Sequence, residues 1–593
     1  MKKPSHIAWV WSIWREHKGL IALLFFLTLL SSAVAVTYPY LSKLLIDLLQ
    51  RLLASPESAS ESALEVRRLA MVVLAVGAAG FVANLFPGIR GAANNIFEYV
   101  IRTKYFHKIL GKDYRFFASF RTGDVTTRLT DDIANDGPKL SWFMCSGIFR
   151  AVESISKIAF CLIAMSLLNW KLTLLSLIPL PLMIIIFSIA SDRIYDTFRK
   201  NQEAISDINS QLEMSFSGVR IIKAYASEAK YERFFSDALR RRFGTEMDVA
   251  RLGTILQLIY QYIDYVAQIG IIFAGGYMAV KGQITVGTFY AFYNYLGMLI
   301  FPILDIPQLF VSGKRAFVNI DRLEEMAGFP EAPAKPRGTR LTEVEDLEVR
   351  DLGFTYQGRE DPALEGLSFK LGKGERLAVV GPVGSGKTTL IKTLAGLIPP
   401  AQGQVLISGR ELSGLEAEDL CALLGYVPQD PLLFSGRIRD NIAFGCPGDG
   451  MEISDQDLQS ALEVAQMSAE VAGFSQGAET LLGQRGLSVS GGQKQRLAIA
   501  RAMARKPKLL LLDDITASLD AANEERLWLS LEEGYRGLTC VVVSHRLSTL
   551  HYTDKVLFLD RGRAKAFGRH EDLVRDNGAY RAFIEEQLST DER

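Results

Sequence analysis

Residues 509–520, LLLLDDITASLD, place four leucines directly before two adjacent carboxylates. An apolar run of this length predicts a strand that is buried on both faces, as in a parallel sheet. A buried, unpaired carboxylate is costly, so we expect Asp513 and Asp514 to meet a ligand outside the end of the strand. Asp513 is predicted to hold Mg²⁺ through water, and Asp514 to orient an attacking water. A helix N-cap after a core strand is the alternative interpretation.

Two other stretches also join a buried strand to polar residues. Arg376–Val380 leads into GPVGSGKT, residues 381–388, and CVVV, residues 540–543, leads into Ser544 and His545. Parallel α/β sheets bind ligands at the carboxyl ends of their strands, so the three ends are expected to form one site. His545 is interpreted as a ligand contact, and a core histidine is the alternative.

The stretch at 381–388 has the spacing G-x-x-x-x-G-K-[ST] of a phosphate-binding loop. Its glycines let backbone N–H groups point inward around phosphates, and the helix that follows contributes its N-terminal dipole. Lys387 is expected to reach the β- and γ-phosphates, and Thr388 to supply a hydroxyl to Mg²⁺. The predicted ATP contacts of this loop are Gly381, Gly384, Ser385, Gly386, Lys387, Thr388 and Thr389.

Length and composition limit the alternatives. The 593 residues are too many for one core, which predicts two to four domains. Lys and Arg (66) balance Asp and Glu (66), so bulk charge does not indicate a nucleic-acid partner. The 5 cysteines are scattered and odd in number, which argues against a disulfide framework or a zinc site.

The excess of hydrophobic residues lies in the first half of the chain. A membrane-spanning helix needs about 20 apolar residues. An interfacial helix is predicted at 5–17, because it carries three tryptophans beside basic residues. A secretory signal fits this stretch poorly, since the apolar run that follows is too long. Six membrane spans are predicted at 20–41, 69–89, 148–168, 172–190, 255–280 and 286–311.

Most Lys and Arg of this half lie at the N-terminus and in two long segments, 91–140 and 192–251. The positive-inside rule therefore predicts that both termini are cytoplasmic. Each long segment contains a stretch where the chain is expected to reverse, at Phe116–Gly123 and Ser215–Glu228.

Two carboxylates fall inside the predicted spans. Asp264 lies in the fifth span, and Asp305 lies in the sixth between Pro302 and Pro307, where a kink is expected. Ionisable groups inside spans are candidates for function, and these two are predicted to line a substrate cavity that favours cationic amphiphiles. Interfacial or helix-pairing carboxylates are the alternative.

The character of the chain changes after residues 327–340, which are rich in Pro and Gly and predict a linker. From 341 to 593, short apolar runs alternate with helical patterns, which indicates an α/β domain. The predicted architecture is an all-α six-helix transmembrane domain, residues 1–326, followed by an α/β P-loop NTPase domain.

The stretch VSGGQKQRLAIARA, residues 489–502, adds a family resemblance. With this signature after the phosphate loop, the chain resembles the exporters that carry an ATP-binding cassette (ABC), as a half-transporter with six spans and one nucleotide-binding domain. The resemblance implies a plasma-membrane protein, in the format of a bacterial inner membrane, that exports amphiphilic drugs or lipids by alternating access.

The resemblance also implies roles for single residues. Tyr356 matches the aromatic residue that stacks on adenine, and Gln429 matches the glutamine that senses the γ-phosphate and Mg²⁺. The two reversal stretches match the coupling helices. The other matches are the signature residues Ser490, Gly491, Gly492 and Gln493, which close on ATP held by a second chain, Asp520 of the loop that crosses the dimer interface, and the switch histidine His545.

Four positions depart from the family pattern. Asp514 replaces the catalytic glutamate, Ile515 a usual proline, Gln484 a usual glutamate, and Val489 a leucine. Aspartate is one methylene shorter, so hydrolysis at this chain's own site is expected to be slow while ATP still binds. This pattern favours a heterodimer with a different half-transporter. A homodimeric lipid or lipid A-type flippase and an ATP-gated channel or regulatory subunit are the alternatives.

Overall fold

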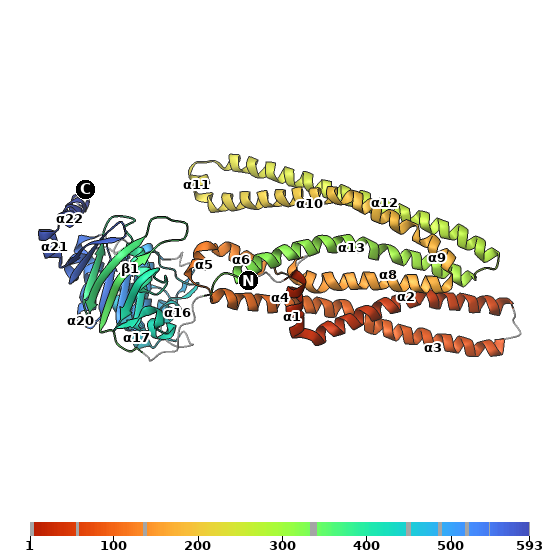
Figure 1. Ribbon diagram of the computed structural model, residues 1–593, viewed down its shortest axis with the longest axis horizontal. Coiled ribbons are helices and arrows are strands. Elements are labelled where there is room, and N and C mark those ends of the chain that lie inside the picture. Colours follow the sequence, from red (N-terminus) through yellow and green to blue (C-terminus); the bar gives the residue numbers. More distant parts are fainter. Residues whose placement is uncertain are drawn as a thin grey trace. The chain divides into compact units, whose positions relative to one another are not determined.

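The computed structural model divides the chain into two units (Figure 1). It describes residues 5–54, 59–134, 139–331, 341–445, 452–483, 489–515, 521–535, 537–544 and 546–591. The first unit comprises residues 1–111 and 120–329, and the second comprises residues 112–119 and 330–593. The second unit thus takes in a short segment from within the helical half of the chain.

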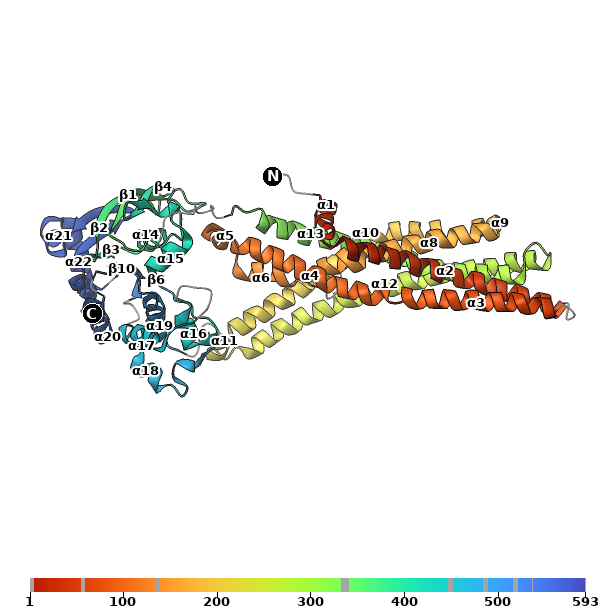
Figure 2. The ribbon, with the colours of Figure 1, turned by 90° about the horizontal axis from the view of Figure 1, so that it is seen from below.

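The first unit consists of helices, of which the long ones run side by side while short ones such as α1 lie across or between them (Figures 1 and 2). They include α1 (His6–Trp14), α2 (Lys18–Ala54), α3 (Ala59–Ala83), α4 (Phe86–Leu110), α6 (Thr122–Thr130), α7 (Leu140–Trp142), α8 (Ile148–Leu168), α9 (Trp170–Leu177), α10 (Pro179–Ser217), α11 (Val219–Ala224), α12 (Glu228–Val280) and α13 (Val286–Ala327). Among the contacts between them, α10 packs against α12, and α13 packs against α2 and α8.

Five helical stretches in the described residues are long and apolar enough to cross a membrane. They contain the first five predicted spans, although the second predicted span runs across the break between α3 and α4 at Asn84–Leu85. The sixth predicted span falls within α13, which continues as one helix through Pro302 and Pro307. The crossing positions themselves stay predictions.

The helices extend well beyond the predicted spans, and short polar caps set where they begin. The Asn169 side chain accepts hydrogen bonds from the backbone N–H groups of Lys171 and Leu172 and starts α9. Thr285 caps α13 in the same way. The two predicted reversals occur at short helices, α5 (Tyr114–Ser119) and α11. Lys392 donates to the Tyr114 hydroxyl at 3.4 Å, which links α5 to the rest of the second unit.

The N-terminal helix α1 packs two of its three tryptophans against the protein, and its interfacial position stays a prediction. Trp9 and Trp14 are buried in the protein, and only Trp11 is largely exposed. The Trp9 indole N–H donates to the Tyr105 hydroxyl at 2.8 Å and to a Glu324 carboxylate oxygen at 3.0 Å. Buried indoles need such partners, and here α4 and α13 supply them.

The second unit is an α/β domain, and its described residues form three sheets. The largest has the order β12-β11-β3-β10-β9-β6, the next has the order β2-β1-β4-β5, and β7 pairs with β8. The strands are β1 (Asp346–Phe354), β2 (Leu364–Gly372), β3 (Arg376–Val380), β4 (Gln402–Ile407), β5 (Arg410–Glu411), β6 (Leu424–Val427), β7 (Gly436–Arg437), β8 (Leu481–Leu482), β9 (Leu509–Asp513), β10 (Thr539–Val543), β11 (Lys555–Asp560) and β12 (Arg563–Gly568).

The helices of this unit are α14 (Lys387–Leu394), α15 (Ala417–Leu423), α16 (Ile438–Ala443), α17 (Asp455–Val464), α18 (Ser468–Gly473), α19 (Gly491–Met503), α20 (Ala521–Gly534), α21 (His570–Asp576) and α22 (Gly578–Asp591). The predicted fold class, a helical transmembrane domain followed by an α/β nucleotide-binding domain, is confirmed.

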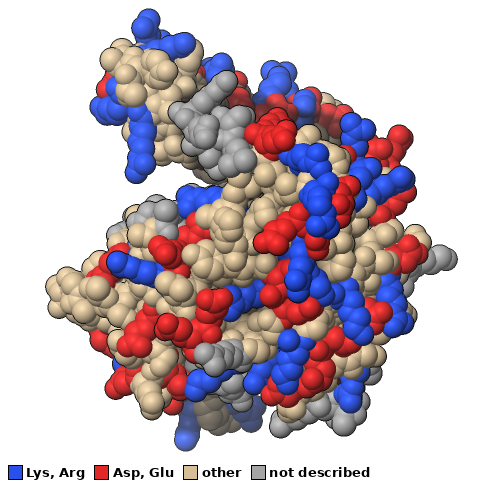
Figure 3. All heavy atoms as spheres, turned by 90° about the vertical axis from the view of Figure 1, so that its left-hand side faces the viewer, with Lys and Arg blue, Asp and Glu red and all other residues tan. Residues whose placement is uncertain are grey.

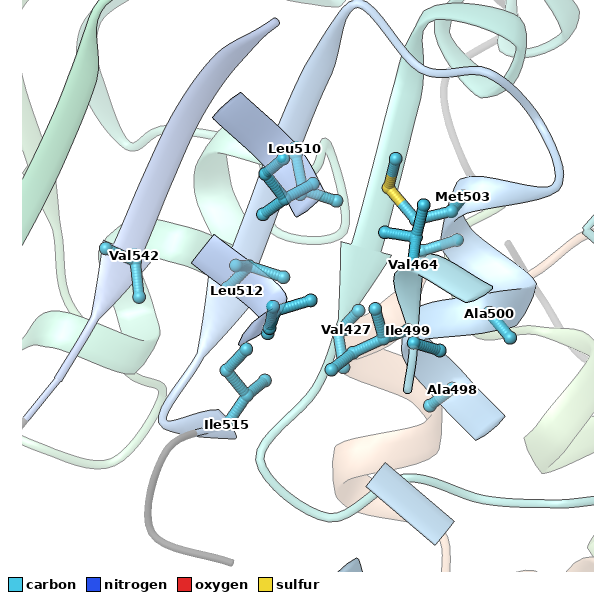
Figure 4. Packing of buried hydrophobic residues seen from close by; sticks show 14 of the residues in the cluster. Val427, Val464, Ala498, Ile499, Ala500, Met503, Leu510, Leu512, Ile515 and Val542 are labelled. Carbon is cyan, nitrogen blue, oxygen red and sulfur yellow. The ribbon is translucent and has the colours of Figure 1, made fainter. Parts of the chain in front are cut away.

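Strand β9 is buried on both faces, as its four leucines predict. Leu510 and Leu512 belong to one hydrophobic cluster, and Leu509 and Leu511 belong to another on the opposite face. Figure 4 shows the first cluster, in which Ile515 lies beside Leu512. Ile515 is fully buried, so the isoleucine that stands where a proline is usual contributes to the core.

Charge is distributed evenly over the surface shown in Figure 3. Lys and Arg alternate there with Asp and Glu, and neither sign forms a continuous patch.

Candidate functional site

The large sheet brings the three polar strand ends to one edge. Strand β10 lies between β3 and β9, and both pairings are parallel. Val543 is in register with Val379 on one side and with Asp513 on the other. The phosphate-binding loop after β3 and the two carboxylates at the end of β9 therefore lie at the same edge, as the sequence predicts.

The backbone of the phosphate-binding loop requires its glycines. Gly384 has φ +82° and Gly386 has φ +102°, conformations that other L-residues rarely adopt. A Cβ on Gly386 would lie 2.4 Å from the carbonyl oxygen of Ala363, so the loop also approaches another backbone segment closely. Within the loop, the Ser385 N–H donates to the Pro382 carbonyl at 3.2 Å, which stabilises this tight turn.

Lys387 and Ser385 supply polar side chains inside this loop. The Lys387 ammonium group donates to the carbonyl oxygens of Gly381 and Pro382, at 2.8 and 2.9 Å. Burial lowers the pKa of Lys387, while the charges of Asp514 and Asp513 oppose that shift. The Ser385 hydroxyl is buried and makes no hydrogen bond within the described part of the chain. A buried hydroxyl of this kind fits a site built for a polar ligand.

Thr388 and Asp513 form the candidate cation site. The Thr388 hydroxyl donates to Asp513 Oδ1 at 3.2 Å across the gap between α14 and β9. Asp513 is 1% exposed, and burial raises the pKa of its carboxyl above the ordinary value. Hydroxyl and carboxylate oxygens are the ligands that Mg²⁺ prefers, together with water and substrate phosphates. The residues present thus fit a magnesium–nucleotide complex.

We expect Asp513→Asn to make the nucleotide-free protein more stable at neutral pH. Because the folded-state pKa of Asp513 lies above that of the unfolded chain, burial of the ionised carboxylate opposes folding above the folded-state pKa. That cost disappears as the pH falls below the ordinary pKa of 3.8. Stabilising changes at functional sites typically contribute about 0.5–2 kcal/mol.

Thermal unfolding of the full chain at a series of pH values from about pH 3 to about pH 8, a range that spans the ordinary pKa of a carboxyl group, measures the effect. Asp430→Asn serves as the control, because Asp430 is exposed. A stability gain that is independent of pH, or that is equal in both variants, would contradict the explanation.

Asp514 lies in a strained backbone conformation next to this pair. Its φ is +51°, which is uncommon for a residue other than glycine. Its backbone N–H donates to the Val543 carbonyl at 3.1 Å, and its Oδ2 accepts a hydrogen bond from Gln429 Nε2 at 3.3 Å. Gln429 is itself held by Gln495, which donates to its backbone carbonyl at 3.3 Å. The structure thus brings Gln429, Asp513 and Asp514 together.

The structure also places Tyr356 and the signature residues, which are predicted to contact nucleotide. Tyr356 is half-buried, and its hydroxyl lies 3.1 Å from that of Thr389. The signature residue Ser490 caps α19, with its hydroxyl accepting from the Gln493 backbone N–H at 3.3 Å, and Gly491 and Gly492 form the first turn of that helix. Asp520, His545 and Gln484 lie outside the described residues.

The acidic residues of the predicted spans differ in their contacts. Asp264 accepts a hydrogen bond from Gln268 at 2.8 Å through Oδ2, while its buried Oδ1 has no hydrogen-bond partner among the described residues. Asp305 is half-buried within α13. A buried carboxylate oxygen without a hydrogen-bond partner in the described residues, inside a predicted span, makes Asp264 a candidate for ligand contact.

Sequence reasoning missed Glu524, a buried carboxylate on α20. It accepts hydrogen bonds from Arg546 at 3.1 Å, Ser548 at 3.2 Å and Thr549 at 2.8 Å, and so fixes the loop that follows β10. Glu524 follows Asp520 by four residues, which is about one helical turn. This position was the only signal in the sequence, because an acid on the buried face of a helix needs hydrogen-bond partners.

Both units match known protein families. Residues 21–303 match the ABC transporter transmembrane region, and residues 364–517 match the ABC transporter domain. The "Probable multidrug resistance ABC transporter ATP-binding/permease protein YheI" of Bacillus subtilis is 32% identical over 83% of this chain and 83% of its own length. The chain belongs to the ABC transporters.

Other relatives agree with this assignment. The multidrug resistance-like ATP-binding protein MdlA of Escherichia coli is 30% identical over 81% of this chain and 80% of its own length. The ATP-dependent lipid A-core flippase of Pseudomonas fluorescens is 29% identical over 81% and 78%. The solved structure of a bacterial Atm1-family ABC exporter with ATP bound covers 97% of this chain and 99% of its own, with a TM-score of 0.78 and 23% identity, and shows the fold alone.

The ABC transporter assignment confirms the prediction of an ATP-driven exporter. The chain is a multi-pass membrane protein and a half-transporter that functions as a dimer, and it couples ATP hydrolysis to transport.

Proposed function

We propose that this half-transporter exports hydrophobic or amphiphilic molecules across the plasma membrane by alternating access, and that its own ATP site hydrolyses slowly. The position of Asp514 carries the second part of this proposal. It lies at the end of β9, beside the cation site and within hydrogen-bond distance of Gln429, where the family has a glutamate. Its side chain is one methylene too short for the same reach.

The residues of the site divide into those that would bind ATP and Mg²⁺ and those that would act in hydrolysis. Lys387, Ser385 and the backbone of the phosphate-binding loop bind the phosphates, and Tyr356 stacks on the base. Thr388, Asp513 and Gln429 would hold Mg²⁺, which would supply charge neutralisation at the phosphates. Asp514 would orient water, and His545 would contact the γ-phosphate. This site keeps its binding groups and loses part of its hydrolytic power.

The proposed partner is a different half-transporter that carries a glutamate at this position. Its phosphate-binding loop would meet Ser490, Gly491 and Gly492 of this chain, with Gln493 behind them and Asp520 crossing the interface. Closure of the two domains on ATP would shift the population toward an outward-facing state, and the helices α5 and α11 would transmit the movement. A homodimeric lipid flippase is the second candidate, and the relative named ATP-dependent lipid A-core flippase in Pseudomonas fluorescens supports the flippase activity.

We further propose a bacterial inner membrane with both termini in the cytoplasm, and substrates that are cationic amphiphiles. Asp264 supports the substrate class, because its Oδ1 has no hydrogen-bond partner in the described residues. Asp305 is the second proposed cavity carboxylate.

Asp264→Asn is expected to reduce ATP-dependent uptake of a fluorescent cationic amphiphile into inside-out vesicles by about tenfold, the effect of losing one desolvated charge contact. Basal ATP hydrolysis should persist, because Asp264 belongs to the first unit and the nucleotide-binding residues belong to the second.

Asp248→Asn is the matched control, an exposed carboxylate on the same helix α12. Equal uptake by both variants would contradict the substrate class, and ionic currents through a planar bilayer would favour a channel instead.

A further inference from the structure

Glu470 on α18 binds two side chains of the signature helix α19. Its Oε2 accepts a hydrogen bond from Gln493 Nε2 at 2.8 Å, and its Oε1 accepts one from Arg496 Nη2 at 2.5 Å. Gln493 and Arg496 are three residues apart, so both lie on the same face of α19. One carboxylate thus bridges the helix that begins at the signature to the helical segment before it.

The contact with Gln493 fixes the orientation of its amide. Gln493 Oε1 accepts a hydrogen bond from the backbone N–H of Ser490 at 2.9 Å, and the Ser490 hydroxyl accepts one from the Gln493 backbone N–H. These two bonds form a capping box, which sets the conformation of the first turn. With Nε2 bound to Glu470, Oε1 is the end of the amide that faces Ser490.

A second chain of contacts anchors Arg496. Its Nη1 donates to the backbone carbonyl of Gln466 at 3.0 Å, and Gln466 donates from its side chain to Ser530 on α20 at 3.1 Å. Gln466 has φ +54°, so this residue holds an unfavourable conformation that the contacts stabilise. The network therefore joins α18 and α19 to α20.

We propose that Glu470 is a positioning residue for the signature, and that it sets the geometry with which Ser490, Gly491 and Gly492 meet ATP held by the partner subunit. This inference rests on the proposed function, in which the signature of this chain completes the partner's ATP site. Glu470 acts through Gln493 and touches no nucleotide itself. Its removal frees the amide of Gln493 to rotate and weakens the capping box.

Glu470 also lies on the wall of an open hollow of about 880 Å³, which α17 and α20 help to line. Truncation of Glu470 therefore leaves no sealed cavity in a hydrophobic core, and the fold should survive it. Glu533 lines the same hollow, and in the described residues the Gln493 amide donates to Glu470 rather than to Glu533, so Glu533→Gln offers a matched control.

The test measures ATP hydrolysis by the assembled dimer carrying Glu470→Ala, Glu470→Gln, Glu533→Gln or Ser490→Ala. We expect Glu470→Ala to lower kcat by about tenfold, as for loss of charge-assisted hydrogen bonds, with ATP affinity at this chain's own phosphate-binding loop unchanged. Glu470→Gln keeps an acceptor oxygen and should recover part of kcat. Glu533→Gln should behave as the unsubstituted protein.

The outcomes separate the two proposals. If Ser490→Ala lowers kcat and Glu470→Ala does not, the positioning role is wrong and the proposed function stands. If Ser490→Ala has no effect, the signature does not complete a working site, and both proposals fail. A Glu470→Ala protein that loses kcat, nucleotide affinity and thermal stability together, with no recovery in Glu470→Gln, would mean that Glu470 is merely structural.

Discussion

Asp514→Glu is expected to raise ATP hydrolysis at this chain's own phosphate-binding loop by on the order of a hundredfold, the typical effect of correcting a misplacement of about 1 Å in a catalytic group. The backbone at this position is fixed by the hydrogen bond from the Asp514 N–H to Val543. The added methylene of glutamate therefore leaves the backbone in place and lengthens the reach of the carboxylate.

The measurement is single-turnover hydrolysis by the dimer of this chain and its partner half-transporter, with the partner's own site inactivated. Asp514→Asn is the control, and it should bind ATP as the unsubstituted chain does, because Lys387, Thr388 and Asp513 are retained. The chain purified alone should hydrolyse ATP slowly. Brisk hydrolysis by a homodimer of this chain, unchanged in Asp514→Glu, would contradict both the slow site and the heterodimer.

The strained backbone at Asp514 is relevant to this prediction. A positive φ in a residue other than glycine persists only where the surroundings impose it, and such residues concentrate at functional sites. Aspartate tolerates this conformation better than most residues, because its short polar side chain can hydrogen-bond locally. Glutamate has no such advantage, so a modest loss of stability is expected to accompany the gain in rate.

Sequence alone predicted the centre of the second unit because its signals were strong and local. The four leucines of β9 and the run of β10 define strands that are buried on both faces, and parallel pairing then requires their polar ends to meet. The phosphate-binding loop between a strand and a helix was predicted for the same reason. Each of these features depends on residues that are adjacent in the chain.

Features that depend on distant residues escaped prediction. Trp9 carried an interfacial signal, yet its indole is bound by Tyr105 and Glu324, which lie on other helices. Glu470 and Glu524 look like ordinary surface acids of helices until their partners across the fold are known.

Gly386→Ala is expected to abolish measurable ATP binding at this chain's site, a loss of more than about a hundredfold in affinity. A left-handed conformation alone costs an L-residue about 1–2 kcal/mol, and a steric clash adds to this cost. The new Cβ would lie 2.4 Å from the Ala363 carbonyl oxygen and 2.9 Å from a Leu364 methyl carbon. The loop must therefore shift away from β2. This shift displaces Lys387, the next residue, from its place beside the phosphates.

Gly384→Ala separates the two causes. Gly384 also has a positive φ, +82°, but a Cβ there meets no atom within 4 Å. We expect about a tenfold loss of ATP affinity from the backbone strain alone, with the direction of the loop kept. Equilibrium binding of a fluorescent ATP analogue to each variant of the full-length dimer, with the partner's site blocked, measures both. Equal losses in the two variants would mean that close approach to Ala363 does not determine the shape of the loop, and that strain at the glycines accounts for the whole effect.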